Sequence, residues 1–244
     1  MKVYGHRKNN WTDQEVEQHW DRVASIYIDE NDKVKEAHDQ RFTESMKHLA
    51  LFNKCKVLNV TSRDCEANDY IRKTEPGTSV INAEISSGLI QIAQSIRPHV
   101  RQVKIDTYSQ LPFQDGEFDR ILSLETLEHV SDPVAFLKEL HRVSASDTRL
   151  VLSCPPATSE IPYRVFTFLF GGHGEGPHRF LSSKEVKALF QETGWKLIFH
   201  KGTVLLPVGP AKLQRAAEKL LDKFQGTFIS EFGIRQFFVC IKQG

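Results

Sequence analysis

Histidines and carboxylates that follow short apolar segments are the residues best suited to chemistry in this chain of 244 residues. His129 comes shortly after the apolar segment 120–124, and His178 lies further along the chain. Because an imidazole titrates near neutral pH, either ring can act as the general base that activates a hydroxyl nucleophile. Glu84 and Asp106 follow two other apolar segments, where a carboxylate can accept hydrogen bonds from a ligand. These four side chains are the first candidates for a functional site.

Alternating apolar and helical segments must position these residues. From residue 56 onward, short apolar strands are separated by helical segments of about 10 to 15 residues. This alternation predicts an α/β fold with right-handed βαβ units, in which a mostly parallel, Rossmann-like sheet of seven strands has helices on both faces. Ligands bind beyond the carboxyl ends of the strands in such a sheet. We expect strands at 57–60, 79–83, 102–105, 120–124, 149–153, 195–200 and 235–241. We expect helices at 66–73, 133–143, 183–193 and 211–224, and a further helix that begins at Ser86 or Ser87 and ends at Ile96.

Local signals mark where several helices begin. Asp132 before Pro133 is typical of a helix start, because the Asp side chain accepts from free N–H groups and Pro fits the first helical position. Ser182 and Glu185 have the spacing of a capping box. No repeat or low-complexity linker interrupts the chain. We expect a single domain over 1–244, with a helical N-terminal extension at 1–52 and a lid-like insertion at 157–181.

Charge and cysteine content argue against several classes of protein. The chain has 32 basic and 31 acidic residues, and a formal charge of +1 gives no electrostatic case for a nucleic-acid partner. The four cysteines form no C-x-x-C pair, so we predict neither a disulfide framework nor a metal site, and expect reduced thiols in the cytoplasm. Residues 1–11 lack the apolar core of a secretory signal, and no apolar run is long enough to span a membrane.

Three stretches carry a resemblance to a known family. Residues 118–133 read FDRILSLETLEHVSDP, and they resemble the fourth-strand motif of the class I S-adenosylmethionine-dependent methyltransferases that act on small molecules. Residues 106–119 are similar to the family pattern D-x-x-x-x-LPF-x-D-x-x-FD. The pattern HWDRVA-x-x-Y at 19–27 resembles the helical N-terminal extension that folds over the cofactor in many members. The resemblance implies S-adenosylmethionine as the cofactor.

The resemblance also implies roles for individual residues. Glu84 would accept hydrogen bonds from the ribose hydroxyls, and Ile85 would pack on the adenine ring. Asp106 would bind the adenine amino group, with Thr107 beside it. The full set of implied cofactor-binding residues is Asn59, Thr61, Ser62, Glu84, Ile85, Asp106, Thr107, Ser123 and Leu124.

The first turn departs from the family pattern. Members have a G-x-G-x-G sequence after the first strand, whereas residues 61–65 read TSRDC without a glycine. Glycine there allows positive φ, which costs another residue about 1 to 2 kcal/mol. Asp64 tolerates the left-handed region better than most residues, and the hydroxyls of Thr61 and Ser62 can donate to the methionine carboxylate.

Two classes of function follow from these signals. The first is methyl transfer to a small molecule, with a hydroxyl or carboxyl oxygen as the expected acceptor and His129 or His178 as the base. The second is a methyltransferase fold that has lost its cofactor and serves as a binding or scaffolding subunit. An aromatic cluster within the insertion favours an apolar or ring-bearing substrate; its members are Tyr163, Phe166, Phe168 and Phe170.

Overall fold

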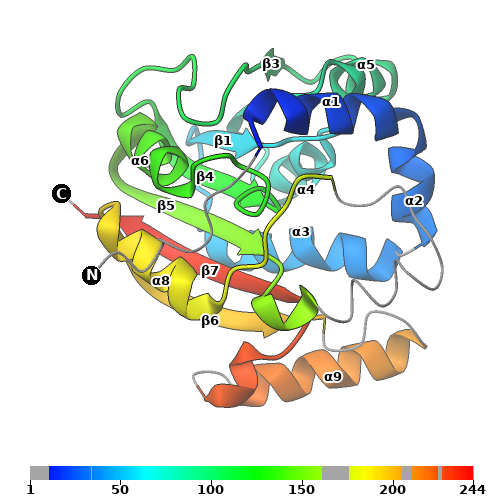
Figure 1. The fold of residues 1–244 in the computed structure, drawn as a ribbon, viewed down its shortest axis with the longest axis vertical. Helices are drawn as coiled ribbons and strands as arrows, with labels where there is room; N and C mark the ends of the chain where they lie inside the picture. The colour runs from blue at the N-terminus through cyan, green and yellow to red at the C-terminus, as the bar shows by residue number, and fades with distance from the viewer. Residues whose placement is uncertain (1–10, 34, 161–175, 205–209, 225–226, 244) are drawn as a thin grey trace.

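One seven-stranded sheet organises the chain in the computed structural model, which describes residues 11–33, 35–160, 176–204, 210–224 and 227–243 (Figure 1). The strands lie in the order β3-β2-β1-β4-β5-β7-β6. Strands β1 to β5 run parallel, while β7 pairs antiparallel with both β5 and β6. The predicted mostly parallel sheet is therefore confirmed. Its strands are β1 (Lys56–Val60), β2 (Ser79–Glu84), β3 (Gln102–Lys104), β4 (Phe118–Leu124), β5 (Ser144–Cys154), β6 (Trp195–Thr203) and β7 (Arg235–Lys242).

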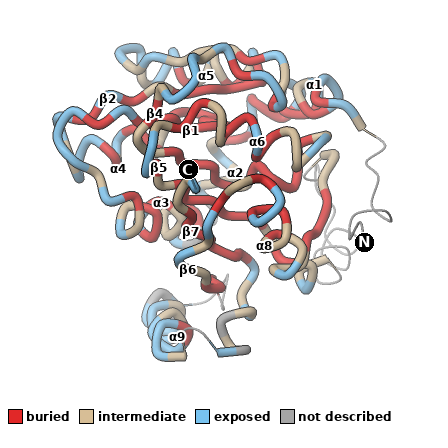
Figure 2. The backbone as a smooth tube through the Cα atoms, turned by 90° about the vertical axis from the view of Figure 1, so that its left-hand side faces the viewer, coloured by how far each residue is buried: buried red, intermediate tan, exposed pale blue. Residues whose placement is uncertain are grey.

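Helices cover both faces of the sheet, because side chains of alternate strand residues point to opposite sides. In β5, Leu150 and Leu152 belong to the apolar cluster under α5, α6 and α8, whereas Val151 belongs to the cluster under α3 and α4. Figure 2 shows the buried strands in the middle of the molecule and α9 at its periphery. The helices are α1 (Asp13–Val23), α2 (Tyr27–Lys33), α3 (Lys35–Leu49), α4 (Glu66–Thr74), α5 (Ser87–Ile96), α6 (Pro133–Val143), α8 (Ser183–Glu192) and α9 (Ala211–Lys223).

The predicted helix starts are confirmed. The Asp132 side chain accepts from the backbone N–H groups of Val134 and Ala135 at 2.9 and 3.0 Å. Ser182 and Glu185 form the capping box of α8. The largest difference in a boundary is at β5, which begins at Ser144, before the predicted start at 149; β4 begins two residues earlier and β6 ends three residues later than predicted. The polar residues that open β5 have no apolar alternation to mark them in the sequence. Ser144 pairs with Phe118 of β4, and the register shifts before Arg149.

Two carboxylates of α1 fasten the N-terminal helix to the loops at the carboxyl edge of the sheet. Asp13 accepts from the Thr107 hydroxyl at 2.7 Å, from Tyr108 N at 2.9 Å and from Ser131 N at 3.0 Å. Asp21 accepts from the Ser86 hydroxyl and from the N–H at the start of α5. Figure 1 shows α1 next to α5 as a result. The predicted helical segment thus covers the strand ends.

The part of the predicted insertion at 161–175, with its aromatic cluster, lies outside the described residues, as do residues 1–10. Within the described part of the chain, no helix is both long enough and apolar enough to cross a membrane.

Candidate functional site

The turn after β1 has three residues with positive φ although it contains no glycine. Thr61, Arg63 and Cys65 have φ angles of 57°, 53° and 66°. These are alternate positions, with the same spacing as the glycines in the family's G-x-G-x-G sequence. Asp64, which the sequence favoured for this conformation, is not among the residues with positive φ. The left-handed conformation costs about 1 to 2 kcal/mol at each such residue, so other contacts must hold the turn.

Hydrogen bonds from neighbouring strands and helices hold this turn. Ser62 N donates to Ala83 O on β2 at 3.0 Å, and Arg63 N donates to Glu84 Oε2 at 2.7 Å. On the other side, the Arg97 guanidinium donates to the backbone carbonyl and the carboxylate of Asp64, both at 2.9 Å. The turn therefore keeps a glycine-like backbone through tertiary contacts rather than through its own sequence.

Glu84 ends β2 in a fully buried position. Its Oε1 accepts from the backbone N–H groups of Ile85 and Ser86, both at 2.9 Å, while its Oε2 accepts from Arg63 N. A carboxylate has about four lone-pair sites, so three backbone donors leave roughly one for a ligand. Glu84 thus lies at the predicted place but fits one further hydrogen bond rather than a pair.

Three other predicted cofactor residues, Asp106, Thr107 and Asn59, differ in their exposure to solvent. The Asp106 side chain is 99% exposed and lies 3.7 Å from Lys104 Nζ, so it points to solvent. Its neighbour Thr107 faces inward, where its hydroxyl donates to Asp13. Asn59 is buried and donates to Asn82 Oδ1 on β2 at 2.8 Å, which makes it part of the sheet.

The remaining predicted cofactor residues are buried near the turn. Ser62 Oγ accepts from Gln102 Nε2 at 2.9 Å. Ile85 and Ser123 are fully buried, and Leu124 is nearly so. Ser123 pairs in register with Val60, the residue before the turn. The structure therefore gathers the predicted residues of β1, β2 and β4 at one edge of the sheet and leaves Asp106 outside.

The Arg63 side chain lies between α1 and the strand ends. Its Cζ is 3.5 Å from the centroid of the Trp20 ring, and the residue is only 7% exposed. Its charge helps to lower the pKa of His129 and opposes the rise in the pKa of Tyr108, so the guanidinium is close to the segments that follow β3 and β4. Side-chain chemistry alone did not single out this residue in the sequence. Its one signal was its position in the turn, where the family has a glycine.

Buried polar atoms without hydrogen-bond partners gather around this turn in the described part of the chain. One is Gln102 Oε1, whose side-chain nitrogen donates to Ser62. Five others are Trp20 Nε1, Thr61 Oγ1, one terminal nitrogen of Arg63, the Tyr108 hydroxyl and Ser123 Oγ. Thr61 and Tyr108 face each other, and this contact opposes the burial that raises the pKa of Tyr108, but their atoms do not complete a hydrogen bond of normal geometry. An unsatisfied buried polar atom costs about 1 to 3 kcal/mol. A cluster of them is expected where a polar ligand binds.

The two candidate bases lie next to each other. The ring centroids of His129 and His178 are 6.3 Å apart. His129 is buried, and its ring is 5.5 Å from that of Trp20. Burial, followed by the charge of Arg63, lowers the pKa of His129 well below its usual value, so the ring is neutral near pH 7. Its Nδ1 lies 2.9 Å from Pro177 O and must carry the proton, because a carbonyl only accepts.

His178 is half-buried, which makes it the more accessible of the two rings. Its Nδ1 lies 2.8 Å from Gly176 O and therefore donates to that carbonyl. The ring also packs edge-on against Phe180 with centroids 5.0 Å apart. Both histidines therefore have one fixed nitrogen, which orients the ring.

A second polar cluster, which the sequence did not indicate, joins α3 to the ends of β4, β5 and β7. Glu125 has a φ of 53°, and its Oε1 accepts from the Ser153 hydroxyl at 2.6 Å and from Arg235 Nε at 3.0 Å. Arg235 also reaches Gln40 on α3, at 3.4 Å. The neighbouring Arg41 has a buried Nε without a hydrogen-bond partner in the described structure. These contacts therefore tie α3 to the place where β4 and β5 end and β7 begins.

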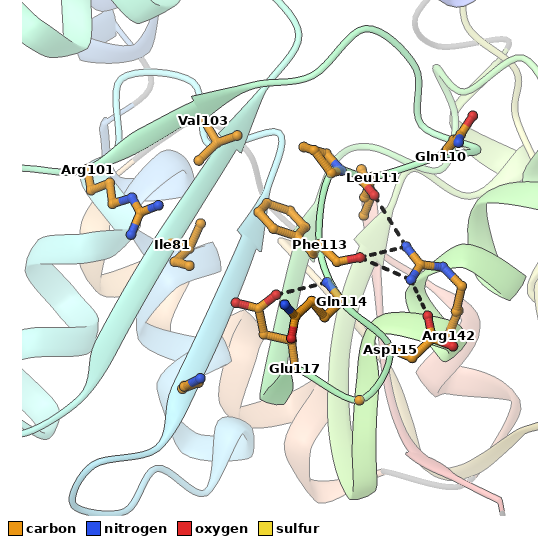
Figure 3. Close-up of a pocket in the computed structure, with 13 residues that line it drawn as sticks. Ile81, Arg101, Val103, Gln110, Leu111, Phe113, Gln114, Asp115, Glu117 and Arg142 are labelled. Carbon is orange, nitrogen blue, oxygen red and sulfur yellow. Dashed lines mark hydrogen bonds and ion pairs between the residues drawn. The ribbon is translucent and has the colours of Figure 1, made fainter.

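A groove elsewhere on the sheet contains none of the predicted site residues (Figure 3). It borders Lys56 at the amino end of β1, and Ile81 and Val103 form its apolar floor. Phe113 lies in the loop before β4, and its backbone carbonyl accepts from the Arg142 guanidinium at 3.0 Å. The groove therefore lies toward the amino ends of the strands, away from the cluster of unpaired atoms.

Comparisons with known proteins agree with this geometry. Residues 64–152 match the family model described as a methyltransferase domain. A demethylmenaquinone methyltransferase of Beutenbergia cavernae is 33% identical over 97 residues, which are 40% of this chain and 39% of that protein. A ubiquinone biosynthesis O-methyltransferase of Ruegeria sp. is 26% identical over 147 residues, which are 54% of this chain and 57% of that protein. The chain thus spans about two fifths of the length of the first relative and somewhat over half of the length of the second.

Among solved structures, SpnF, described as a 4+2 cyclase, superposes with a TM-score of 0.68 at 13% identity, and the match covers 96% of this chain and 97% of SpnF. Strand order and helix placement therefore define a Rossmann-like fold that this chain shares with SpnF. Residues 64–152 thus resemble a methyltransferase domain, and the chain around them has a Rossmann-like fold.

Proposed function

We propose that this protein transfers a methyl group from S-adenosylmethionine to a small molecule with an oxygen nucleophile. The observation that carries the proposal is the cluster of five unpaired buried polar atoms beside a turn that has the backbone of a glycine-rich loop. Burial of so many unsatisfied groups in one place is unfavourable unless a polar ligand completes their hydrogen bonds.

The residues fit the methionine end of this cofactor better than its adenine end. The hydroxyls of Thr61 and Ser123 and the Trp20 indole N–H are donors without partners. Glu84 has about one acceptor site left for a ribose hydroxyl. Asp106 points to solvent, so its proposed contact with adenine has little support. When bound, S-adenosylmethionine supplies an electrophilic methyl group on a sulfonium.

The protein's own contribution to the reaction is to position the acceptor and to receive its proton. A neutral imidazole is the form that a general base needs, and burial favours that form of His129. His178 is half-buried beside it and is the better placed of the two to meet an acceptor that enters from solvent. The names of the two relatives, which refer to quinone compounds, support a ring-bearing acceptor.

Calorimetric titration with S-adenosylmethionine tests the proposal. We expect binding by the unaltered protein and a clearly weaker affinity after Glu84→Ala. Asp106→Ala is the matched control, because it also removes one carboxylate but at an exposed position. An absence of heat at millimolar cofactor would refute the enzymatic proposal. Binding that is unchanged by Glu84→Ala would refute the contact with ribose.

A second candidate function is that of a methyltransferase fold without catalysis, which binds or scaffolds a partner. The observation that favours it is the internal satisfaction of Glu84, both of whose oxygens already accept from backbone N–H groups. The same titration separates the two candidates, because the second predicts a folded protein that does not bind the cofactor.

A further inference from the structure

We propose that Arg63 binds the carboxylate at the methionine end of the cofactor, in a turn where the family has glycine. This inference rests on the proposed function and extends it to a residue that is peculiar to this turn. The backbone N–H of Arg63 is anchored on Glu84 at 2.7 Å. Its side chain then extends toward α1, where the guanidinium stacks on Trp20 at 3.5 Å from the ring centroid.

The charge of Arg63 has no counterion among the described residues. Only 7% of the residue's surface is exposed, and it takes part in no ion pair with the described residues. The carboxylates nearby are engaged elsewhere: Glu84 accepts from three backbone N–H groups, Asp64 pairs with Arg97, and Asp13 accepts from three groups of the loops. An arginine is always charged, and an unpaired buried charge is strongly unfavourable. A ligand with an anionic group would supply the missing counterion.

The unpaired atoms around Arg63 indicate the same ligand chemistry. Trp20 Nε1 and the guanidinium can only donate, and the hydroxyls of Thr61 and Ser123 can donate as well. A group of donors around a cation suits a carboxylate, which accepts several hydrogen bonds and is often bound by arginine in a bidentate way. Stacking on Trp20 holds the guanidinium plane in place before the ligand arrives, so little side-chain freedom is lost on binding.

An opposite role for the same residue makes a contrary prediction. If the Arg63 side chain simply fills the cofactor's space, its removal should strengthen binding. Calorimetry with two nucleosides distinguishes the roles: S-adenosylhomocysteine has the amino-acid carboxylate, and 5′-methylthioadenosine lacks the whole amino-acid group. The proteins are the unaltered chain, Arg63→Gln, Arg63→Lys and the control Arg72→Gln, which removes an exposed arginine from the next helix.

We expect Arg63→Gln to weaken S-adenosylhomocysteine binding by about 10- to 100-fold, the range for a hydrogen bond to a charged group. Arg63→Lys should retain part of the affinity, and Arg72→Gln all of it. Binding of 5′-methylthioadenosine should stay within about twofold in every variant, since it has no carboxylate. Thermal unfolding of each variant verifies that it is folded.

Two results would overturn the role of Arg63 while leaving the proposed function intact. The first is equal or tighter binding of S-adenosylhomocysteine by Arg63→Gln, which would identify the side chain as an internal occupant. The second is an equal loss for both nucleosides, which would identify a structural role. Failure of the unaltered protein to bind either nucleoside would instead overturn the proposed function, and the inference about Arg63 with it.

Discussion

The backbone N–H of Arg63 donates to Glu84 Oε2 at 2.7 Å, and this bond joins the turn after β1 to the end of β2. The carboxylate is fully buried and accepts two more bonds from the start of α5. It therefore holds the turn after β1 against the connection from β2 to α5. A ligand role for Glu84 and a structural role for it are inseparable in this geometry.

Glu84→Gln should destabilise the fold by about 2 to 3 kcal/mol, because an amide places a donor against backbone donors and removes a charge-assisted acceptor. Urea unfolding monitored by circular dichroism measures this loss. Asp106→Asn is the matched control and should change the free energy of unfolding by less than about 0.5 kcal/mol, since that side chain is exposed. Equal effects of the two substitutions would show that Glu84 does not organise the turn.

Cys65 offers a direct measure of strain in the turn. It has a φ of 66° and a fully buried side chain. Cys65→Gly loses packing but relieves about 1 to 2 kcal/mol of backbone strain, whereas Cys65→Ala loses packing and keeps the strain. We therefore expect the glycine variant to be the more stable of the two in urea unfolding.

The control is Cys154, a buried cysteine in the extended strand β5. There glycine should be less stable than alanine by about 0.5 to 1 kcal/mol, because a strand interior gains nothing from positive φ. The same order of stability at both sites would mean that the turn at Cys65 is not strained.

Local patterns predicted the fold well because they act within one element. The apolar strand at 149–153 and the Asp132 cap depend on neighbours in sequence, and both were confirmed. The turn could not be predicted in the same way, because hydrogen bonds from β2 and Arg97, rather than glycine, give Thr61 its positive φ. Its conformation is a tertiary effect.

The candidate site was predicted in part for a related reason. Glu84 ends a strand, so its place followed from the position of that strand. Asp106 and Thr107 lie in a loop, and the bond from Thr107 to Asp13 of α1 decides which of the two faces inward. Contacts between segments that are distant in sequence determine this choice, and the spacing of residues contains no information about them.

Stability should depend on pH through His129. Burial lowers the pKa of this histidine well below its ordinary value of 6.5, so between the two values the unfolded chain binds more protons than the native protein. Stability must therefore rise with pH through this window, level off above about pH 6.5, and fall on acidification. Urea unfolding at several pH values between about 5 and 8 measures the slope.

His129→Asn should reduce that slope, because the amide can still donate to Pro177 O but does not titrate. Some slope should remain, since burial also lowers the pKa of His38 and His200. An unchanged slope in the variant would show that His129 does not lose its proton on folding.

A buried ion pair fastens α3 to β6. Lys201 Nζ lies 2.9 Å from Glu44 Oε1, and the two side chains are only 2% and 4% exposed. Burial opposes both charges, but hydrogen bonds from His48 and Lys47 and the charge of Lys201 hold the pKa of Glu44 well below its usual range. Glu44→Gln should cost about 1 to 3 kcal/mol, because the ammonium loses its buried partner and keeps only its ion pair with the half-exposed Asp222.

The double variant Glu44→Gln, Lys201→Met should recover part of that loss, because it also removes the buried ammonium that has lost its buried partner. Urea unfolding of the unaltered protein, both single variants and the double variant completes the cycle. If the double variant loses as much free energy of unfolding as the two single variants together, the two side chains contribute independently.

The attachment of α1 over the strand ends should depend on Asp13. Three hydrogen bonds from Thr107, Tyr108 and Ser131 lower the pKa of this carboxyl despite its burial, so the carboxylate is the form that holds α1 to both loops. In Asp13→Asn an amide N–H faces these donors, and at least one bond is lost at a cost of about 1 to 3 kcal/mol. Val16, Trp20 and Val23 pack the rest of α1 into the core, so we expect local opening of its first turn rather than global unfolding. Hydrogen exchange should then accelerate in 11–16 and 105–110 by about 5- to 100-fold and stay unchanged in β4 and β5. Asp29→Asn, an exposed position in α2, is the control and should alter neither segment. Faster exchange throughout the sheet would show instead that α1 and the core unfold as one unit.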